Sequence, residues 1–118
     1  MRQNTEALNI SAEMAGIHAA AYERGREPVR TILDEELALC VLRLELSGAE
    51  AVLVAHGHQQ AVCSQRDAFE HALAPTLSAA VERATGRTVT TVLSTTQLAP
   101  TLTLLTFLFA PRQLRGNA

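Results

Sequence analysis

The sequence of 118 residues contains no lysine and no tryptophan, and only one tyrosine, three phenylalanines and two cysteines. All ten basic residues are therefore arginines, scattered from Arg2 to Arg115 against twelve acidic residues. Because nucleic-acid binding needs a concentrated positive field, we expect no nucleic-acid partner. With 47% apolar and 19% charged residues, the composition indicates a globular chain rather than a disordered one.

The two cysteines, Cys40 and Cys63, lie in apolar surroundings without a C-x-x-C spacing. This pattern favours buried free thiols in a reducing compartment, although the sequence leaves a bridge between them open. The N-terminal segment carries Arg2 and Glu6 and lacks the apolar run of a secretory signal. We therefore expect a cytoplasmic protein. Its length suffices for one continuous core, so residues 1–118 are predicted to form a single domain.

Residues 88–111 carry no charge and would be long enough to cross a bilayer. Eight of these residues are threonine, and a break at residues 95–100 separates two apolar runs. These features favour two strands, at about 88–95 and 101–109, over a membrane span. Residues 104–110 are apolar on both faces, which predicts a central or interface strand.

Apolar residues recur at helical spacing in two segments. The first predicts a helix over residues 7–21 that packs on a sheet and ends with Gly25 in the left-handed conformation. The second predicts a helix over residues 59–84, closed by Gly86. Pro75 cannot donate the usual backbone hydrogen bond, so we expect a kink or a break there.

Between these helices, residues 29–33 and 37–46 read as a hairpin around a polar turn. Ser47 and Glu50 have the spacing of a capping box, which predicts a short helix to His56, stopped by Gly57. The expected element order is α-β-β-α-α-β-β. This order predicts an α+β fold with two layers, in which helices cover a four-stranded sheet made of two hairpins. The strand order stays open.

Between residues 15 and 111 the chain resembles a bacterial domain family of unknown biochemistry, MpsC, named for a sodium-translocating, membrane-potential-generating system. The resemblance is carried by an ordered set of short matches: Glu23-Arg24-Gly25-Arg26-Glu27-Pro28, Leu44, Leu46, Ser47 to Glu50, Gly57, Val62, Arg66, Phe69, Leu73, Pro75, and Ala84-Thr85-Gly86-Arg87-Thr88-Val89. It implies an accessory of a membrane-associated system, acting through a partner that spans the membrane. The family often has an aromatic-rich stretch between the last two strands. Residues 93–98 replace it here, so that if this loop recognises a target, we expect that target to differ.

Arg66 lies on the apolar stripe of the second long helix, where a guanidinium is costly unless it is paired or bound to an anion. Glu70 at i+4, Asp67, or Glu50 from the preceding helix could pair with it. Two interpretations stay open: a structural ion pair, or contact with a ligand or partner. For the second, the candidate contact residues are Arg66, Glu50 and Arg87.

His56, His58 and Cys63 are the only short-range cluster of metal-ligand types. Gly57 ends a helix between the two histidines and no zinc spacing is present, so we expect no metal site and no cofactor. His71 lies off the apolar stripe and should be exposed. The sequence also lacks a Gly-rich phosphate loop and a nucleophile elbow.

We therefore expect a non-enzymatic domain that forms a homodimer and contacts a protein partner. The apolar residues on both faces of the strands support this expectation, because a two-layer domain needs only one apolar sheet face. One alternative is a sensor of small molecules or anions that uses Arg66. A less favoured alternative is a metal-dependent enzyme at His56, His58 and Cys63.

Overall fold

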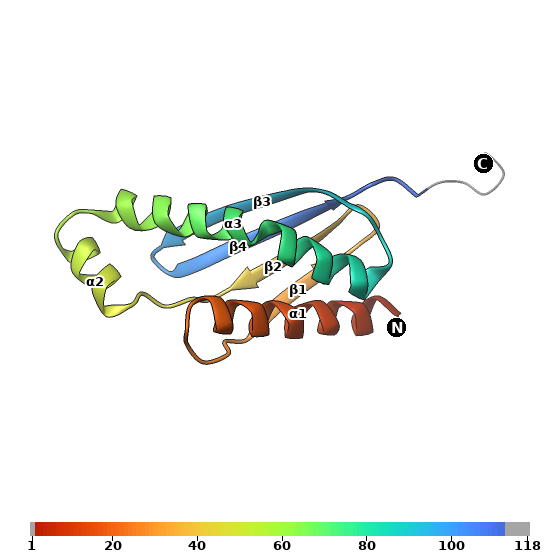
Figure 1. Cartoon of the computed structure of the whole chain (residues 1–118), viewed down its shortest axis with the longest axis horizontal. Coiled ribbons are helices and arrows are strands. Elements are labelled where there is room, and N and C mark those ends of the chain that lie inside the picture. Colours follow the sequence, from red (N-terminus) through yellow and green to blue (C-terminus); the bar gives the residue numbers. More distant parts are fainter. Residues whose placement is uncertain (1, 113–118) are drawn as a thin grey trace.

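The computed structural model describes residues 2–112, which form three helices and four strands (Figure 1). In chain order, the elements are α1 (Arg2–Ala21), β1 (Val29–Leu33), β2 (Leu37–Leu42), α2 (Gly48–Ala55), α3 (Gln59–Thr85), β3 (Val89–Leu98) and β4 (Thr101–Phe109). The predicted order α-β-β-α-α-β-β and the α+β class are confirmed.

The four strands form one antiparallel sheet in the order β1-β2-β4-β3. The central strands β2 and β4 pair from Leu37 opposite Leu108 to Leu42 opposite Thr103. The prediction of a central strand at residues 104–110 is confirmed, because β4 lies between β2 and β3. The edges of the sheet are β1 and β3.

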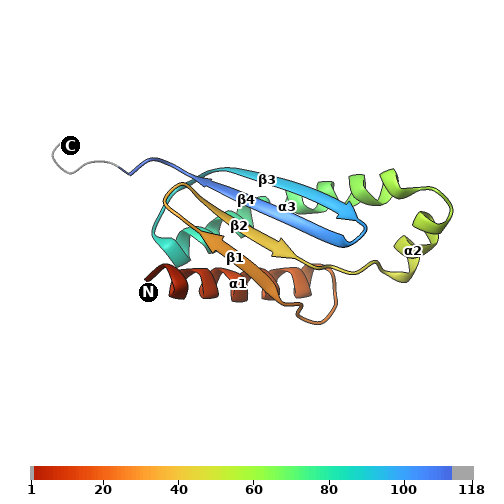
Figure 2. The same cartoon turned by 180° about the vertical axis from the view of Figure 1, so that it is seen from behind.

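Helices α1 and α3 lie side by side on one face of the sheet, and Figure 2 shows that no described helix covers the other face. Helix α1 packs mainly on β1, and α3 packs mainly on β3. The core between the layers comprises Ile10, Met14, Ala38, Cys40, Leu42, Leu44, Leu77, Ala80, Val81, Leu105, Phe107 and Phe109. Alternate strand residues point to the uncovered face. We call its apolar set the open face: Ile32, Leu37, Leu39, Val41, Leu93, Leu102, Leu104 and Leu108.

The end of α1 differs from the prediction, because the left-handed residue is Glu23, with a φ of 53°, and not Gly25. The amides of Glu23 and Arg24 donate to the carbonyls of Ala20 and Ala19. This is the Schellman arrangement, which usually has glycine in the left-handed position. The two hydrogen bonds close the helix before Gly25 is reached.

The sequence predicts a kink or a break at Pro75; helix α3 is continuous there, so the break is absent. Proline removes one hydrogen bond to the carbonyl of His71. Both residues are exposed, so water can reach the freed carbonyl. The exposure of His71 confirms its prediction. Gly86, with a φ of 70°, ends α3 as predicted.

Two strand ends also differ from the prediction. Strand β2 ends at Leu42 instead of residue 46, because the carbonyls of Leu44 and Glu45 accept hydrogen bonds from Arg66 instead of from a strand. Strand β3 continues to Leu98, which pairs with Thr101. Residues 93–98 are thus part of a strand and not a loop.

The uncharged residues 88–111 therefore form a hairpin, as predicted. No helix in the described part of the chain combines the length and the apolar character needed to cross a membrane.

Candidate functional site

Arg66, near the start of α3, is almost completely buried, with 1% of its surface exposed. Its Nε and Nη2 atoms donate to the two carboxylate oxygens of Glu50, over 2.9 and 2.8 Å. Its Nη1 atom donates to the carbonyl of Leu44 over 2.6 Å, and Nη2 also donates to the carbonyl of Glu45 over 2.9 Å. These contacts use four of the five N–H groups of the guanidinium. Arg66 thus joins α3 to α2 and to the segment after β2.

The capping box of α2 holds Glu50 in place for this ion pair. The amide of Glu50 donates to the Ser47 hydroxyl over 3.1 Å, and the amide of Ser47 donates to the Glu50 carboxylate over 2.9 Å, which confirms the prediction. The hydrogen bond from Arg66 is the main cause that lowers the pKa of Glu50. Glu50 in turn raises the pKa of Arg66. Both groups are therefore charged at neutral pH.

A second buried polar pair lies next to the first. His18 on α1 and Glu70 on α3 are each 1% exposed, and Nε2 of His18 lies 2.8 Å from Oε1 of Glu70. The hydroxyl of Tyr22 donates to the other oxygen of Glu70 over 2.9 Å. The Tyr22 ring also faces the Arg66 guanidinium, 5.8 Å from its centroid. We call His18, Tyr22, Glu50, Arg66 and Glu70 the polar cluster.

The hydrogen bonds of His18 fix the charge of its pair with Glu70. Nδ1 lies 2.8 Å from the carbonyl of Met14, and a carbonyl only accepts, so Nδ1 carries a proton. Nε2 and the Glu70 carboxyl then share one further proton. The pair has no net charge whichever atom holds that proton. The pair therefore brings no unpaired charge into the interior, and its polar atoms are hydrogen-bonded to one another, to Met14 and to Tyr22.

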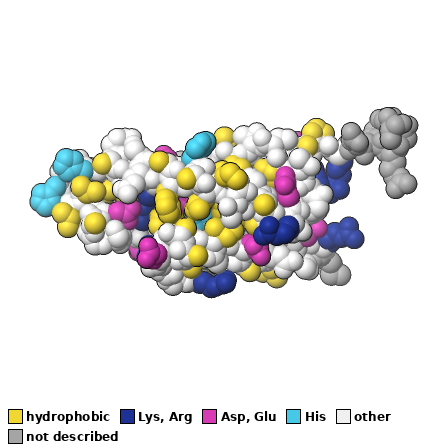
Figure 3. Space-filling view, in the orientation of Figure 1, with side chains coloured by type: hydrophobic (Ala, Val, Ile, Leu, Met, Phe, Trp, Pro, Cys, Tyr) yellow, Lys and Arg dark blue, Asp and Glu magenta, His cyan; other side chains and the backbone are white. Residues whose placement is uncertain are grey.

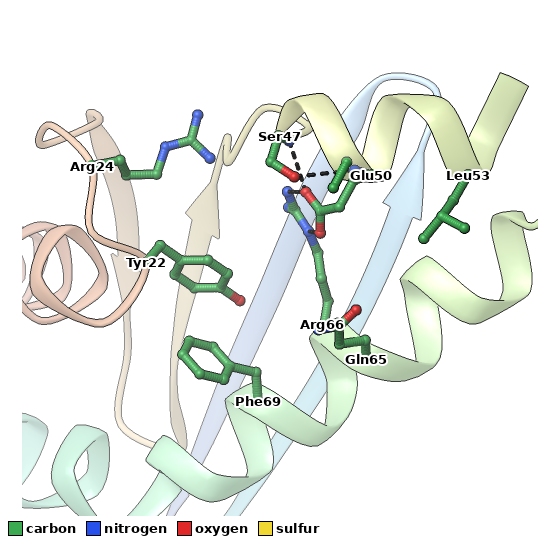
Figure 4. A pocket seen from close by; sticks show the side chains of 9 residues that line it. Tyr22, Arg24, Ser47, Glu50, Leu53, Gln65, Arg66 and Phe69 are labelled. Carbon is green, nitrogen blue, oxygen red and sulfur yellow. Dashed lines mark hydrogen bonds and ion pairs between the residues drawn. The ribbon is translucent and has the colours of Figure 1, made fainter.

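A cavity of about 320 Å³ opens beside the polar cluster, and we call it the α2–α3 cavity. Figure 4 shows that side chains from the end of α1, from α2 and from α3 line it. Its lining comprises Tyr22, Arg24, Ser47, Ala49, Glu50, Leu53, Gln65, Arg66 and Phe69. Phe69 packs edge-on against Tyr22, with centroids 4.7 Å apart, and remains 37% exposed. Because aromatic and aliphatic side chains form much of the wall, the cavity suits an apolar group.

The sequence singled out Arg66 and Glu50, and the structure brings them together. Of the two other suggested partners of Arg66, Glu70 pairs with His18 instead, and Asp67 is exposed. We did not predict the burial of His18. The spacing contained one signal of this burial: His18 lies four residues after Met14, on the side of α1 that carries the recurring apolar residues.

Arg87 does not belong to this site. It follows α3, and its guanidinium lies over the Phe109 ring, 4.7 Å from the centroid. Its Nη2 atom donates to the carbonyls of Glu35 and Ala110, over 2.9 and 3.2 Å. The 21 residues from Arg66 to Arg87 span about 30 Å at the helical rise per residue. Arg87 therefore ties the β1–β2 turn to the end of β4, at the far end of α3.

His56 and His58 are exposed at the connection between α2 and α3. Cys63 is half-buried, and its thiol lies 3.9 Å from the carbonyl of Thr96 on β3. Within residues 2–112, no three histidine, cysteine, aspartate or glutamate side chains are grouped so that they could hold a metal ion. The structure thus does not join His56, His58 and Cys63 into one site.

Residues 3–111 match the model of a protein family described as "Na+-translocating membrane potential-generating system (MpsC)". The match includes the predicted region of resemblance and extends through most of α1. Among curated proteins and solved structures, no significant match to the chain is found.

Proposed function

The chain belongs to the MpsC family, and we propose that it is a cytoplasmic, non-enzymatic domain that forms a homodimer and contacts a protein partner. The name of the family associates it with a sodium-translocating system that generates membrane potential. In our proposal the domain is an accessory of such a system, and its partner is one of the system's proteins.

The main observation in support of the proposed homodimer is the apolar character of the open face. Its eight apolar side chains come from all four strands, and Leu93 and Ile32 are 53% and 46% exposed. Among the paired residues of the sheet, Arg30 is the only charged one, and it lies at the β1 edge. A sheet that is apolar on both faces is typical of strands buried on both sides. A second copy of the same face would provide that cover.

The size of the open face sets the expected strength of the dimer. Four strands about 4.8 Å apart and about 20 Å long give roughly 400 Å² of flat area per copy. With the relief of the side chains, two copies would bury on the order of 1,000 Å², the lower limit for a specific interface. We therefore expect a dimer that dissociates at micromolar concentrations.

Light scattering on the purified full chain tests the homodimer. At tens of micromolar we expect the mass of a dimer, and Leu93→Glu should give a monomer, because the new carboxylate would be buried in the interface. Ala72→Glu, on the exposed side of α3, is the matched control and should stay dimeric. A monomeric wild-type chain, or equal masses for both variants, would contradict the proposal.

The alternative, a sensor of small molecules or anions, has one supporting observation, the α2–α3 cavity beside Arg66. The internal contacts of Arg66 favour a structural role instead, because they use four of its five N–H groups and leave one for a ligand. A thermal-shift measurement with phosphate and sulfate decides between these roles. A ligand at one hundred times its dissociation constant would add about 2.7 kcal/mol of stability.

A further inference from the structure

Helix α2 is a short apolar helix that the fold leaves on its surface. Its eight residues are Gly48, Glu50 and six alanine, valine or leucine residues, and none of the eight is buried. A helix with apolar residues around its whole circumference is normally enclosed by protein or lipid. Its single charge, on Glu50, is engaged by Arg66 and the capping box. The helix thus presents no unpaired charge to its surroundings.

The lack of charge continues past α2 into α3. Residues 51–65 contain no acidic residue and no arginine. Val52 is 59% exposed, and Figure 3 shows apolar side chains together with histidines at the end of the molecule where α2 lies. Depletion of charge around exposed apolar side chains is the composition of an interface centre.

The α2–α3 cavity lies directly beside this surface. Leu53 on α2 and Phe69 on α3 stand on opposite sides of it, with the Tyr22 ring at the end of α1 (Figure 4). An apolar helix surface next to an apolar cavity is the arrangement in which a bound helix inserts one large side chain. In such interfaces, a few well-packed side chains carry most of the binding energy.

We propose that the surface formed by α2 and the α2–α3 cavity binds an amphipathic helix of a partner protein, and that a large apolar side chain of this helix enters the cavity. This inference rests on the partner contact in the proposed function. It does not depend on the homodimer, which uses the open face.

Two other occupants fit the surface less well. A second copy would have to fill the cavity with its own α2, whose exposed large apolar side chain is the short Val52. The area of an eight-residue helix is also small for a dimer interface. A lipid surface normally attracts helices whose polar face carries lysine or arginine, and residues 51–65 have neither.

Photo-crosslinking in the native host tests the inference. A benzophenone amino acid replaces Val52, or as a control the exposed Thr76 on α3, in the full-length chain. We expect a protein crosslink from position 52 only, and mass spectrometry should place it in an amphipathic helix of a second protein. Crosslinks only between copies of this chain, crosslinks to lipid, or no signal above the Thr76 control would overturn the inference.

Three variants connect the crosslink to the cavity and distinguish it from the dimer. Phe69→Ala removes one wall of the cavity and should reduce the crosslink at least tenfold, with its melting temperature measured in parallel. Val52→Asp at the exposed position should abolish co-purification of the crosslinked protein while leaving the mass in light scattering unchanged. Leu93→Glu should leave the crosslink intact even if the dimer is lost. Loss of the crosslink in Leu93→Glu would assign the signal to the dimer and overturn the inference.

Discussion

The hydroxyl of Tyr22 donates a 2.9 Å hydrogen bond to Glu70, whose other carboxylate oxygen contacts His18. His18 lies near the end of α1, Tyr22 follows directly after that helix, and Glu70 belongs to α3. One carboxylate therefore joins the two helices that cover the sheet. The ring of Tyr22 also faces the Arg66 guanidinium at 5.8 Å, so the tyrosine contacts both polar pairs.

Tyr22 should resist ionisation in the folded protein. Burial, followed by the charge of Glu70, raises its pKa above the ordinary value of 10.0. The neutral phenol is thus favoured in the fold, and its stabilisation is present below pH 10.0 and lost as the pH rises further. Tyr22 is the only tyrosine and tryptophan is absent, so the phenolate absorbance reports on this residue alone. We expect no phenolate just above pH 10.0 in the native protein and normal ionisation in urea. Native ionisation near 10.0 would contradict the buried hydrogen bond.

Arg66→Ala should destabilise the fold strongly. The change leaves Glu50, whose side chain is 16% exposed, without its partner and frees the carbonyl of Leu44. Loss of one member of a buried pair costs about 3 kcal/mol or more. Arg112→Ala is the matched control, since its pair with Glu35 is exposed and should contribute less than about 1 kcal/mol. Urea unfolding of both variants gives the two free energies.

The same Arg66→Ala variant also separates the structural and binding roles of the residue. If the ion pair is structural, binding of the partner falls only through unfolding. If Arg66 contacts a ligand or partner, the melting temperature should stay the same or rise while binding is lost, because binding sites often reduce stability. A variant with unchanged stability and unchanged binding would exclude both roles.

The ion pair should make stability depend on pH through Glu50. Its pKa in the fold is below the ordinary value of 4.5, so the unfolded chain takes up a proton first as the pH falls. The stabilisation is fully present above pH 4.5 and is lost as the pH falls towards the folded pKa. We expect the difference in unfolding free energy between wild type and Glu50→Gln to shrink over this range. A difference that stays constant down to acid pH would contradict the prediction.

Both thiols should react slowly with a thiol reagent in the native state and rapidly after unfolding. Cys40 is completely buried between the layers, and burial raises its pKa to about 11. The thiolate is the reactive form, so Cys40 is protected both by its lack of access to the reagent and by the low fraction of thiolate. Cys63 is half-buried between α3 and β3. Variants that keep one cysteine each allow separate rates to be measured, and rapid native labelling of Cys63 would show that its packing is loose.

Glu23→Gly should leave stability unchanged or raise it by up to about 1 kcal/mol. A left-handed conformation costs a non-glycine residue about 1–2 kcal/mol, and this gain is partly offset by the greater freedom of glycine in the unfolded chain. Gly25→Ala is the control: Gly25 has no positive φ, and an added Cβ meets no atom within 4 Å. It should therefore not be destabilising. A clear loss of stability in Glu23→Gly, measured by urea unfolding, would mean that the glutamate side chain contributes to the turn.

The parts of the fold that depend on neighbouring residues could be predicted from the sequence. The capping box at Ser47 and Glu50 needs only a three-residue spacing, and the ends of α2 and α3 follow from Gly57 and Gly86. The end of α1 could not be predicted in the same way. Its hydrogen bonds allow any residue that tolerates a left-handed φ, and the chain uses Glu23 where a glycine two residues later was available.

The polar cluster shows where local patterns are insufficient. The position of Arg66 on an apolar stripe revealed that it needs a partner, but three carboxylates were within reach along the chain. The choice of Glu50 over Glu70 depends on His18, which is 52 residues away from Glu70 in the sequence. A pattern within one helix contains no information on such a contact. The strand order also depends on contacts between residues far apart in the sequence, such as the pairing of β2 with β4.

The order β1-β2-β4-β3 relates the two halves of the chain to one another. Each half contributes a helix followed by a hairpin, α1-β1-β2 and α3-β3-β4, and each helix packs on the edge strand of its own hairpin. The central strands are antiparallel, and α1 and α3 run in opposite directions (Figure 1). An approximate twofold axis through the middle of the sheet would therefore superpose one half on the other.

This internal symmetry separates local from distant steps in folding. Each half can close its own hairpin and helix through contacts that are near in the sequence, whereas the two halves of the sheet meet in the six residue pairs of β2 and β4. Pairing β2 with β4 joins residues that are far apart in the sequence, so this step carries the main loss of chain entropy in forming the sheet. Helix α2 has no counterpart in the first half. It is the linker between two equivalent units, and the Arg66–Glu50 pair holds that linker against the second one.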